Sequence, residues 1–288
     1  MKISILGTGL MGSALGEGLM KAGYEIIAYN RTASKTEALV ALGAKSVATP
    51  AEAIETADAV ILVVADESGV RDLLLNDAIR PLLSGKKILN ASTTNPEEIV
   101  KITREVEEAG GSLAEMSIMI GAEELRDKKG QFLLGCKASD EVFWEEILGS
   151  IGESTHRVGE VGDASKAEAP MLLSSMFLSV AAAYAAAFVT KLNVPKEISE
   201  HMIQTAIPGS EYLLPNLFAR DYSQCMASVD AFTSVSNTAI GSAKSLGVPT
   251  KILEDMLGLY AAAAKRGFGE QDGSAILEVL LNPNVGEF

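Results

Sequence analysis

The stretch KISILGTGLMG, residues 2–12, decides the fold of this chain, because it is a short apolar strand that runs directly into a G-x-G-x-x-G turn. Ala14, Leu15 and Leu19 follow at helical spacing, and a second apolar run occupies residues 25–29. Strand, glycine turn, helix and strand in this order are the setting in which the glycine motif marks a dinucleotide-binding βαβ unit. We therefore predict a Rossmann unit in this part of the chain.

Each glycine of the turn has its own steric role. Gly7 permits the tight turn, Gly9 lets the backbone approach a pyrophosphate, and Gly12 lets the helix pack closely on the strand. The phosphates would lie against the positive N-terminus of the helix. We expect cofactor contacts from the whole loop: Gly7, Thr8, Gly9, Leu10, Met11 and Gly12.

The end of the second strand bears on which nicotinamide cofactor binds. An NAD site places an acidic residue there to hold the ribose 2′-hydroxyl, whereas this chain has Asn30. A carboxylate would repel the 2′-phosphate of NADPH, and Asn30 is followed by hydrogen-bond donors and positive charges: Arg31, Thr32, Ser34 and Lys35. The pattern favours NADPH. The alternative is that residues 30–32 form only a turn and a helix cap with a solvated arginine.

Composition limits the classes of partner. The chain has 288 residues, enough for about two domains. Its 38 acidic and 24 basic residues give a net charge of −14, which argues against a nucleic-acid partner and favours a small-molecule substrate. Cys136 and Cys225 lack the spacing of a metal or redox site, so we expect no bound metal and reduced thiols in a cytoplasmic protein.

Hydropathy predicts a soluble protein that does not associate with membranes. Met1 leads directly into the first strand and leaves no room for a signal peptide. The longest apolar stretch, near residues 176–189, reads as too short and too rich in alanine to span a bilayer.

The organisation of the chain changes near residue 160. Residues 1–162 alternate strand and helix patterns, which predicts an α/β, mainly parallel, doubly wound sheet of the Rossmann type. Residues 163–192 are predicted to be a long interdomain helix, apolar on nearly all sides, so we infer that a second copy of the chain buries it in a homodimer. Residues 193–288 are predicted to be an all-α second domain, with helices at 196–205, 211–219, 223–245, 251–266 and 274–281.

The chain resembles the β-hydroxyacid dehydrogenase superfamily and, within it, the imine reductases. The resemblance is carried by the glycine loop, by YNRTASKTEALVALGAKSVATPAEAIETADAVILVVADESGVRDLL at 29–75, by ILNASTTNPEE at 88–98 and by GEQDGSAILEVL at 269–280. It implies an NADPH-dependent oxidoreductase in which two chains intertwine. Each active site then lies in the cleft between a nucleotide domain and a helical domain of the dimer.

Departures from the superfamily pattern bear on the substrate. Hydroxyacid dehydrogenases hold a substrate carboxylate with a serine-glycine-glycine turn, and this chain has residues 118–121, IMIG, in that place. The asparagines that follow their catalytic lysine are absent as well. We expect a pocket lined by Met116, Met119 and Met176, which favours an apolar imine over a small hydroxy acid.

Two residues compete for the proton-handling role. Transfer of a hydride to C=O creates an alkoxide that needs an acid, which suits Lys166, whereas a protonated C=N needs a negative or polar group, which suits Glu168. An ungapped match from residues 193–195 puts Glu168 at the place of the superfamily's lysine, whereas counting from Gly162 allows either residue.

Local helix geometry leaves a further alternative open. Residues two apart on a helix point in different directions, so only one of Lys166 and Glu168 would face a given cleft. Ser165 and Glu168 could instead form a capping box. Pro170 suits a first helical turn, which predicts a helix that starts near Ser165 or later.

Further candidates follow the other predicted strands. Asn90 matches an active-site asparagine of the imine reductases, and its alternative role is a strand-end cap. Cofactor contacts are also expected from the turns after the strands at 59–64 and 87–89: Val64, Ala65, Asp66, Asn90, Ser92 and Thr93, with Thr94 beside them. Asp66 could simply cap a helix. Tyr184, Tyr212 and Asp230 are possible polar residues of the pocket from the second domain.

The sequence therefore predicts an NADPH-dependent reductase of C=N substrates, with Glu168, Lys166 and Asn90 as candidate catalytic residues. A semialdehyde or hydroxyacid reductase that uses Lys166 and a non-catalytic NADPH-binding protein are the alternatives.

Overall fold

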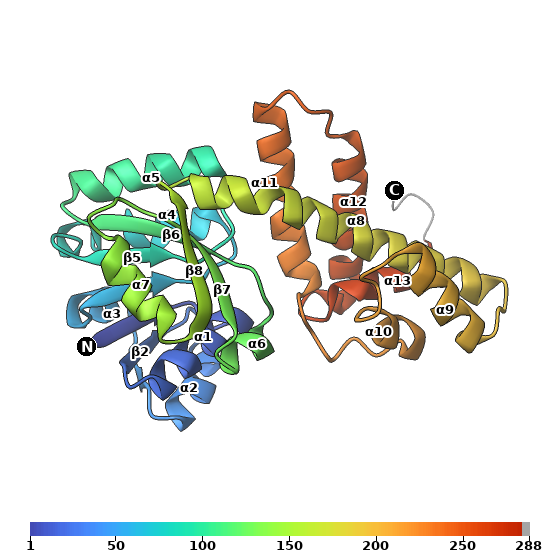
Figure 1. Ribbon diagram of the computed structural model, residues 1–288, viewed down its shortest axis with the longest axis horizontal. Helices are drawn as coiled ribbons and strands as arrows, with labels where there is room; N and C mark the ends of the chain where they lie inside the picture. Colours follow the sequence, from blue (N-terminus) through green and yellow to red (C-terminus); the bar gives the residue numbers. More distant parts are fainter. Residues whose placement is uncertain (284–288) are drawn as a thin grey trace. The chain divides into compact units, whose positions relative to one another are not determined.

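The computed structural model describes residues 1–283. The described chain divides into two compact units, the first covering Met1–Glu168 and the second starting at Ala169 (Figure 1). Of the domain predicted at 193–288, the last five residues lie outside the described part.

The first unit is built on a sheet that contains eight strands within residues 1–283. The order across the sheet is β3-β2-β1-β4-β5-β6-β7-β8, and every neighbouring pair is parallel except β6 and β7, which are antiparallel. This is the Rossmann-type, mainly parallel sheet that the sequence predicts. The strands are β1 (Lys2–Leu6), β2 (Glu25–Tyr29), β3 (Lys45–Ser46), β4 (Ala59–Leu62), β5 (Lys87–Asn90), β6 (Ser112–Ile118), β7 (Gly130–Gly135) and β8 (Gly152–Gly159).

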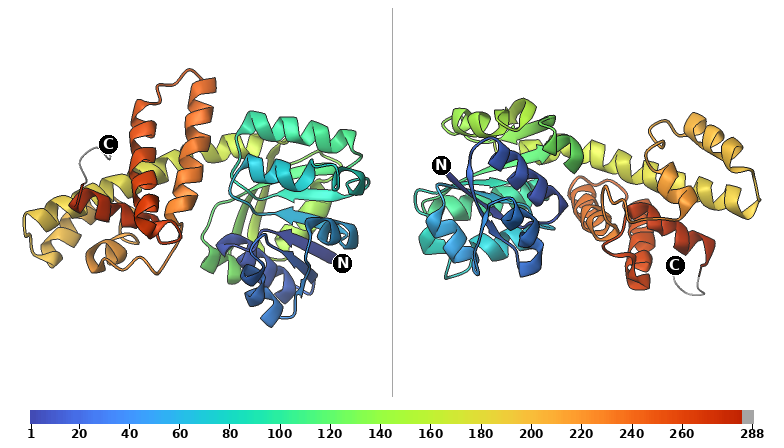
Figure 2. Two further views of the ribbon diagram at one scale, coloured as in Figure 1. Left: turned by 180° about the vertical axis from the view of Figure 1, so that it is seen from behind. Right: turned by 90° about the horizontal axis from the view of Figure 1, so that it is seen from below.

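Helices cover both faces of this sheet (Figure 2). They are α1 (Leu10–Lys21), α2 (Glu37–Ala41), α3 (Pro50–Thr56), α4 (Glu67–Leu74), α5 (Pro96–Glu108), α6 (Ala122–Arg126) and α7 (Glu141–Gly149). Successive strand residues alternate between two cores, as the pleat requires. Ile3 and Ile5 of β1 pack with side chains of α1, α6 and α7, whereas Leu6 packs with side chains of α3, α4 and α5.

A single long helix, α8 (Asp163–Lys191), crosses the boundary of the two units. The helix begins at Asp163, the first residue of the interdomain helix predicted at 163–192 and two residues before Ser165, and it contains Pro170 in its interior. The backbone amides at its start are satisfied by a carboxylate from β6, which stabilises a helix that begins there. Gly159 and Gly162, at φ +146° and +101°, turn the chain from β8 into α8.

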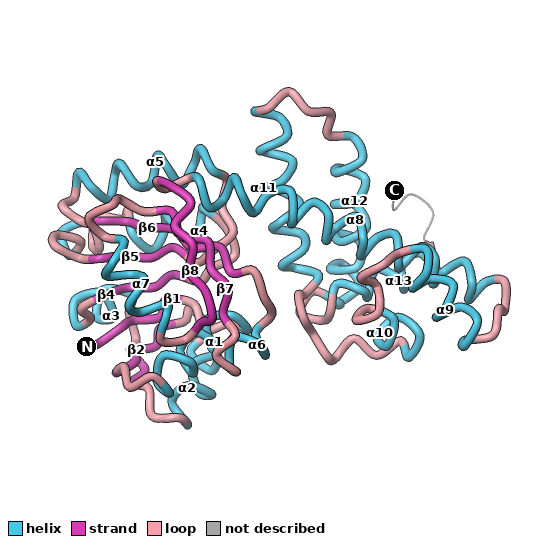
Figure 3. The backbone as a smooth tube through the Cα atoms, viewed as in Figure 1, coloured by secondary structure: helices cyan, strands magenta, loops and turns pink. Residues whose placement is uncertain are grey.

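The second unit consists, in its described part, of helices joined by loops (Figure 3). Besides α8 it contains α9 (Lys196–Ala206), α10 (Leu214–Ala219), α11 (Val229–Ser245), α12 (Lys251–Ala263) and α13 (Ile276–Leu281). The helices predicted at 211–219 and 223–245 start later than expected, at Leu214 and Val229. Ser228 caps α11 by accepting a hydrogen bond from the Ala231 amide, which places that helix start.

The GEQDGSA motif, residues 269–275, makes hydrogen bonds and packing contacts within the core of the second unit. The buried carboxylate of Asp272 accepts hydrogen bonds from the amides of Met226 and Ser274 and from the Ser274 hydroxyl. A Cβ at Gly273 would overlap the ring of Phe232. The motif therefore has a packing and capping role within this unit.

Within the second unit α8 is buried on one side only. Its alanines at 182, 183, 186 and 187 lie in the core, as close helix packing requires. The opposite side carries an exposed row, here called the α8 stripe: Phe177, Ala181, Tyr184, Phe188 and Leu192. Within the single chain, this helix is therefore not buried on all sides.

The expectation that the apolar run is too short for a bilayer also needs correction. Among the described residues, α8 alone is long and apolar enough to cross a membrane, a criterion of length and composition that core helices of soluble proteins also meet. The helix is longer than the run at 176–189 because it begins at Asp163 and includes the apolar residues Met171, Leu172 and Leu173 before that run.

Candidate functional site

The glycine loop after β1 has the close packing that its motif predicts. Gly7, at φ +104°, donates its N–H to the carbonyl of Tyr29 over 2.8 Å, and a Cβ at Gly7 would overlap the carbonyl oxygen of Val63. A Cβ at Gly12 would in turn overlap the carbonyl oxygen of Gly7. Gly9 differs, because a Cβ there would meet no atom within 4 Å. Two of the glycines are required for packing, and the third faces open space.

The N-terminus of α1 suits an anion. Within the described structure, no side chain caps the helix at Gly9, and its first turn holds no acidic residue. Leu10, the first helical residue, is exposed. The uncapped amides and the space at Gly9 are what a pyrophosphate group needs. The loop therefore fits the dinucleotide expected from the motif.

Asn30 joins this loop to the end of β2. Its Oδ1 accepts the N–H of Thr8 over 3.1 Å, and its Nδ2 donates to the carbonyl of Thr32 over 3.0 Å. The Thr8 hydroxyl donates to the carbonyl of Lys35. Arg31 is exposed beside these residues. The amide of Asn30 thus holds two loops together at the place where an NAD site has a carboxylate.

The turns after β4 and β5 are also joined. The N–H of Val64 donates to the Ser92 hydroxyl over 2.9 Å. Asn90 is buried, and its amide group donates to the Ser92 carbonyl and the Thr94 hydroxyl while its Oδ1 accepts from the Ser92 N–H. Both amide hydrogens of Asn90 are therefore used within its own turn, which is the strand-end role that the sequence left open.

Asp66 has the other role that the sequence allowed. Its carboxylate accepts the amide of Gly69 at 3.0 Å and the hydroxyl of Ser68 at 2.6 Å, so it caps α4. Ala65 precedes it, and Thr93 lies half-buried in the turn after β5.

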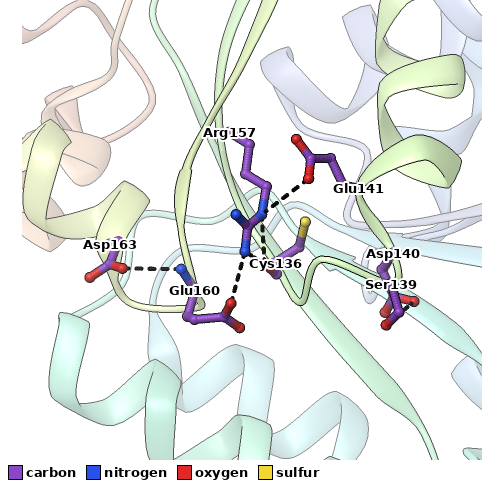
Figure 4. Close-up of polar contacts among 7 residues, drawn as sticks. All are labelled: Cys136, Ser139, Asp140, Glu141, Arg157, Glu160 and Asp163. Atoms are coloured by element: carbon purple, nitrogen blue, oxygen red, sulfur yellow. Dashed lines mark hydrogen bonds and ion pairs between the residues drawn. The ribbon is translucent and has the colours of Figure 1, made fainter.

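Lys166 points away from the buried part of α8. It is exposed, and its Nζ lies 2.8 Å from Oδ1 of Asp163, a pair that raises the pKa of Lys166. The other Asp163 oxygen accepts the N–H of Glu160, as Figure 4 shows. In the same view, Arg157 donates to the carbonyl of Cys136 and pairs with Glu160, so the turn between β8 and α8 is fixed at both ends.

Glu168, near the start of α8, is buried. Only 8% of it is exposed, and its Oε2 accepts the hydroxyl of Ser117 over 3.0 Å. Burial raises the pKa of Glu168 to about 7, the hydrogen bond from Ser117 lowers it, and the negative charge of Glu115 raises it. The capping box proposed for Ser165 and Glu168 does not form, because the Ser165 amide donates to Glu115 instead.

Glu115 is a buried charge that the predicted site does not include. Its Oε1 accepts the amides of Gly162, Ala164 and Ser165, and its Oε2 accepts the Ser165 hydroxyl. Burial raises its pKa, and these hydrogen bonds oppose that rise. A glutamate in the middle of the apolar strand SLAEMSI is the sequence signal that could have identified it.

Two of the three methionines predicted to line a pocket are buried, each within the core of its own unit. Met116 is buried in the core on the face of α1, α6 and α7, and Met176 is buried in the second unit against Ser236. Their predicted lining role is wrong, because both side chains are enclosed. Met119 is half-buried after β6.

The remaining candidates belong to the second unit. Tyr184 and Tyr212 are about half exposed, and the Asp230 carboxylate lies against Gly269. A cavity of about 590 Å³ in this unit contains none of these residues and is lined by Arg220, Asp221, Tyr222, Ser223, Phe268, Gln271 and Glu278. No cluster of metal-ligating side chains occurs among the described residues.

Comparison with known proteins places these features in a family. The sequence model described as the NAD binding domain of 6-phosphogluconate dehydrogenase matches residues 2–159. Glyoxylate/succinic semialdehyde reductase 2 of Arabidopsis thaliana is 29% identical over 289 residues, which cover 97% of this chain and 79% of that protein. The cytokine-like nuclear factor N-PAC of Xenopus tropicalis is 31% identical over 170 residues, 57% of this chain, but the match spans only 31% of that longer protein.

Solved structures share the fold over nearly the whole chain. 3-Hydroxyisobutyrate dehydrogenase from Salmonella typhimurium superposes with a TM-score of 0.84 at 20% identity and covers 97% of this chain and 99% of its own. An imine reductase from Myxococcus stipitatus in complex with NADP+ has a TM-score of 0.64 at 23% identity and covers 98% and 100%.

Proposed function

This chain belongs to the family of the NAD-binding domain of 6-phosphogluconate dehydrogenase, within the β-hydroxyacid dehydrogenase superfamily of oxidoreductases, and we propose that it is an NADPH-dependent reductase of C=N bonds. The observation that carries the proposal is Glu168, a buried carboxyl whose pKa is raised to about 7, in the early turns of α8. The ungapped match from the turn at 193–195 supports the proposal by aligning Glu168 with the superfamily's lysine, whereas counting from Gly162 also allows Lys166.

The surroundings of Lys166 weaken the alternative in which this lysine is the proton donor. Lys166 is exposed and paired with Asp163, which favours its charged form and leaves no buried proton donor there. A carboxyl group that titrates near neutral pH is suited to give up and regain one proton in each cycle. Glu168 meets this requirement.

Reduction of a C=N bond adds a hydride to carbon and a proton to nitrogen. When bound, NADPH supplies the hydride. The protonated Glu168 gives its proton to the imine nitrogen, and the resulting carboxylate stabilises the positive charge on the substrate. Glu168 then regains a proton from water. A carbonyl substrate carries no positive charge before hydride transfer, so the carboxylate of Glu168 would give it no such stabilisation.

The nucleotide loop supports the cofactor part of the proposal. The uncapped amides of α1 and the space at Gly9 would hold the pyrophosphate. Asn30 introduces no negative charge at the end of β2, and the exposed Arg31 would pair with a 2′-phosphate. These features favour NADPH over NADH.

The experiment is a comparison of NADPH oxidation with 1-pyrroline, 2-methyl-1-pyrroline, 3,4-dihydroisoquinoline and succinic semialdehyde. We expect turnover of the cyclic imines by the unaltered protein. Because a positioned acid contributes about 10²–10⁴-fold, Glu168→Gln should lower kcat at least about 100-fold. Lys166→Ala, two residues away and exposed, is the matched control and should leave kcat within about twofold.

Two outcomes would contradict the proposal. Reduction of succinic semialdehyde alone, abolished by Lys166→Ala, would identify a semialdehyde reductase, the activity named for the Arabidopsis relative. Cofactor binding without oxidation of NADPH by any of the four compounds would indicate a non-catalytic NADPH-binding protein.

We further propose that the protein is a cytoplasmic homodimer. The α8 stripe presents Phe177, Tyr184 and Phe188 to solvent in the single chain, with 45%, 45% and 65% of each residue exposed. Contiguous large apolar side chains of this kind are typical of a protein interface. A second copy of the same helix is the occupant that the family resemblance implies.

A further inference from the structure

Glu115 and Ser117 are alternate residues of β6, so their side chains leave the same face of the sheet. Both are buried, at 1% and 4% exposure, and both reach the N-terminal part of α8. Glu115 holds the first turn of that helix, and Ser117 holds Glu168. The neighbouring Met116 points to the opposite core. One strand therefore supplies two separate polar contacts to one helix.

The contact of Glu115 sets the position of the helix. Its Oε1 lies 2.6 Å from the amide nitrogen of Gly162 and 2.8 Å from that of Ala164. Its Oε2 lies 2.6 Å from the Ser165 hydroxyl oxygen. These donors all point at the carboxylate, and an anion at a helix N-terminus is stabilised by the helix dipole. The start of α8 is thereby fixed to the sheet, six residues or fewer before Glu168.

The contact of Ser117 sets the position of the acid itself. The Ser117 hydroxyl donates to Oε2 of Glu168, and 51 positions separate the two residues in the sequence. Within the described structure this is the one hydrogen bond shown for the Glu168 carboxyl. The second oxygen is left for another partner.

We propose that Glu115 and Ser117 are positioning residues for Glu168: Glu115 fixes the helix turn that carries the acid, and Ser117 holds one carboxyl oxygen so that the other faces the reacting atom. This inference rests on the proposed function of Glu168. It adds two residues that act through Glu168 without contact with substrate.

The two residues act on the proton affinity of Glu168 in opposite directions. The hydrogen bond from Ser117 favours the ionised form and lowers the pKa, whereas the nearby charge of Glu115 favours the protonated form and raises it. On its own helix, Lys166 and Asp163 are exposed and paired with each other. Glu115, on the face of β6 that contacts α8, is the ionisable group whose charge acts on Glu168.

Because Ser117 and Glu115 shift the pKa of Glu168 in opposite directions, substitutions of the two residues should have opposite effects. Residues with only a structural role would not show this. Ser117→Ala removes the donor and should raise the pKa of Glu168 by about one pH unit. Glu115→Gln removes the charge but keeps an oxygen for the amides of α8, and the Ser165 hydroxyl can turn to accept from its amide group. It should lower the pKa of Glu168 by about one pH unit.

The matched control is Ser112→Ala. Ser112 lies on the same strand, and its hydroxyl donates to Asp140 at the far end. This variant should leave the titration of Glu168 unchanged. If Glu115→Gln fails to fold, Ser117→Ala with this control still decides the proposal.

The titration is read in two ways. An infrared titration of the protonated carboxyl band, taken as the difference from Glu168→Gln, reports the pKa without turnover. The pH profile of kcat/KM with 2-methyl-1-pyrroline reports it during catalysis. An unshifted infrared titration in both Ser117→Ala and Glu115→Gln would overturn the inference. Infrared shifts of opposite sign without any imine reduction would support the positioning and reject the proposed function.

Discussion

The Cα of Gly12 packs so closely against Gly7 that a Cβ at Gly12 would overlap the carbonyl oxygen of Gly7. We expect Gly12→Ala to destabilise the fold by about 1–3 kcal/mol, because the backbone carbonyl cannot move aside. Thermal unfolding checks this. Gly9→Ala is the control, since a Cβ there meets open space in the protein. It should keep the melting temperature and still weaken NADPH binding about tenfold or more, because the added methyl occupies the place of the pyrophosphate. Equal loss of stability in both variants would refute this.

Arg31 is expected to set the preference for NADPH. Its side chain is exposed next to Asn30, where a 2′-phosphate would lie. Arg31→Ala should weaken NADPH binding about tenfold, the strength of a charge-assisted hydrogen bond, and leave NADH binding unchanged. Fluorescence titration of both cofactors measures this. A parallel loss for NADH would show that Arg31 acts on the fold of the loop.

The pH dependence of imine reduction should follow Glu168. Because protonated Glu168 is the proposed donor, kcat/KM with a neutral imine should fall as pH rises through about 7. An N-methylated, permanently charged iminium needs no proton and is stabilised by the carboxylate, so its kcat/KM should rise through the same pH. Steady-state kinetics with the two substrates across this pH range distinguishes the falling profile from the rising one. Identical profiles would exclude proton donation by Glu168.

Glu168 should also make stability depend on pH. Its pKa in the folded protein, about 7, lies above its ordinary value of 4.5, so the folded state binds the proton more tightly than the unfolded state. The stabilisation is complete below about pH 4.5 and is lost as pH rises through about 7. At 1.36 kcal/mol per pH unit, it amounts to roughly 3 kcal/mol at most. Urea unfolding across this range should show a decline that Glu168→Gln lacks. An equal decline in the variant would place its origin in another group.

The α8 stripe should form the interface of the homodimer. Phe188, at 65% exposure, is its most exposed aromatic residue. Phe188→Glu places a charge in the proposed interface and should convert dimers to monomers in light-scattering chromatography. Val142→Glu, at a site of 75% exposure on α7, is the control and should remain dimeric. A monomer for the unaltered protein would disprove the assembly.

Much of the fold could be predicted from local pattern. The strands at residues 59–62 and 87–90 and the turn at Gly7 follow from apolar runs and glycine placement. The late starts of α10 and α11 were not predicted as well. The Ser228 hydroxyl caps α11 by accepting the Ala231 amide, whereas α10 begins at Leu214 without a side-chain cap. The group that caps the start of α8 was not predicted, because the carboxylate of Glu115 comes from β6, far away in the sequence.

The candidate site also contains some features that local sequence specifies and others that depend on tertiary contacts. The order of residues already located the nucleotide loop, Asn30 and the long helix, because a βαβ unit and a helix are specified by residues near one another in the chain. The difference between the exposed Lys166 and the buried Glu168 required the folded chain. Burial and the contact of Glu168 with Ser117 across 51 positions arise only when β6 packs against α8, and it is this removal from water that moves the pKa of Glu168 to about 7.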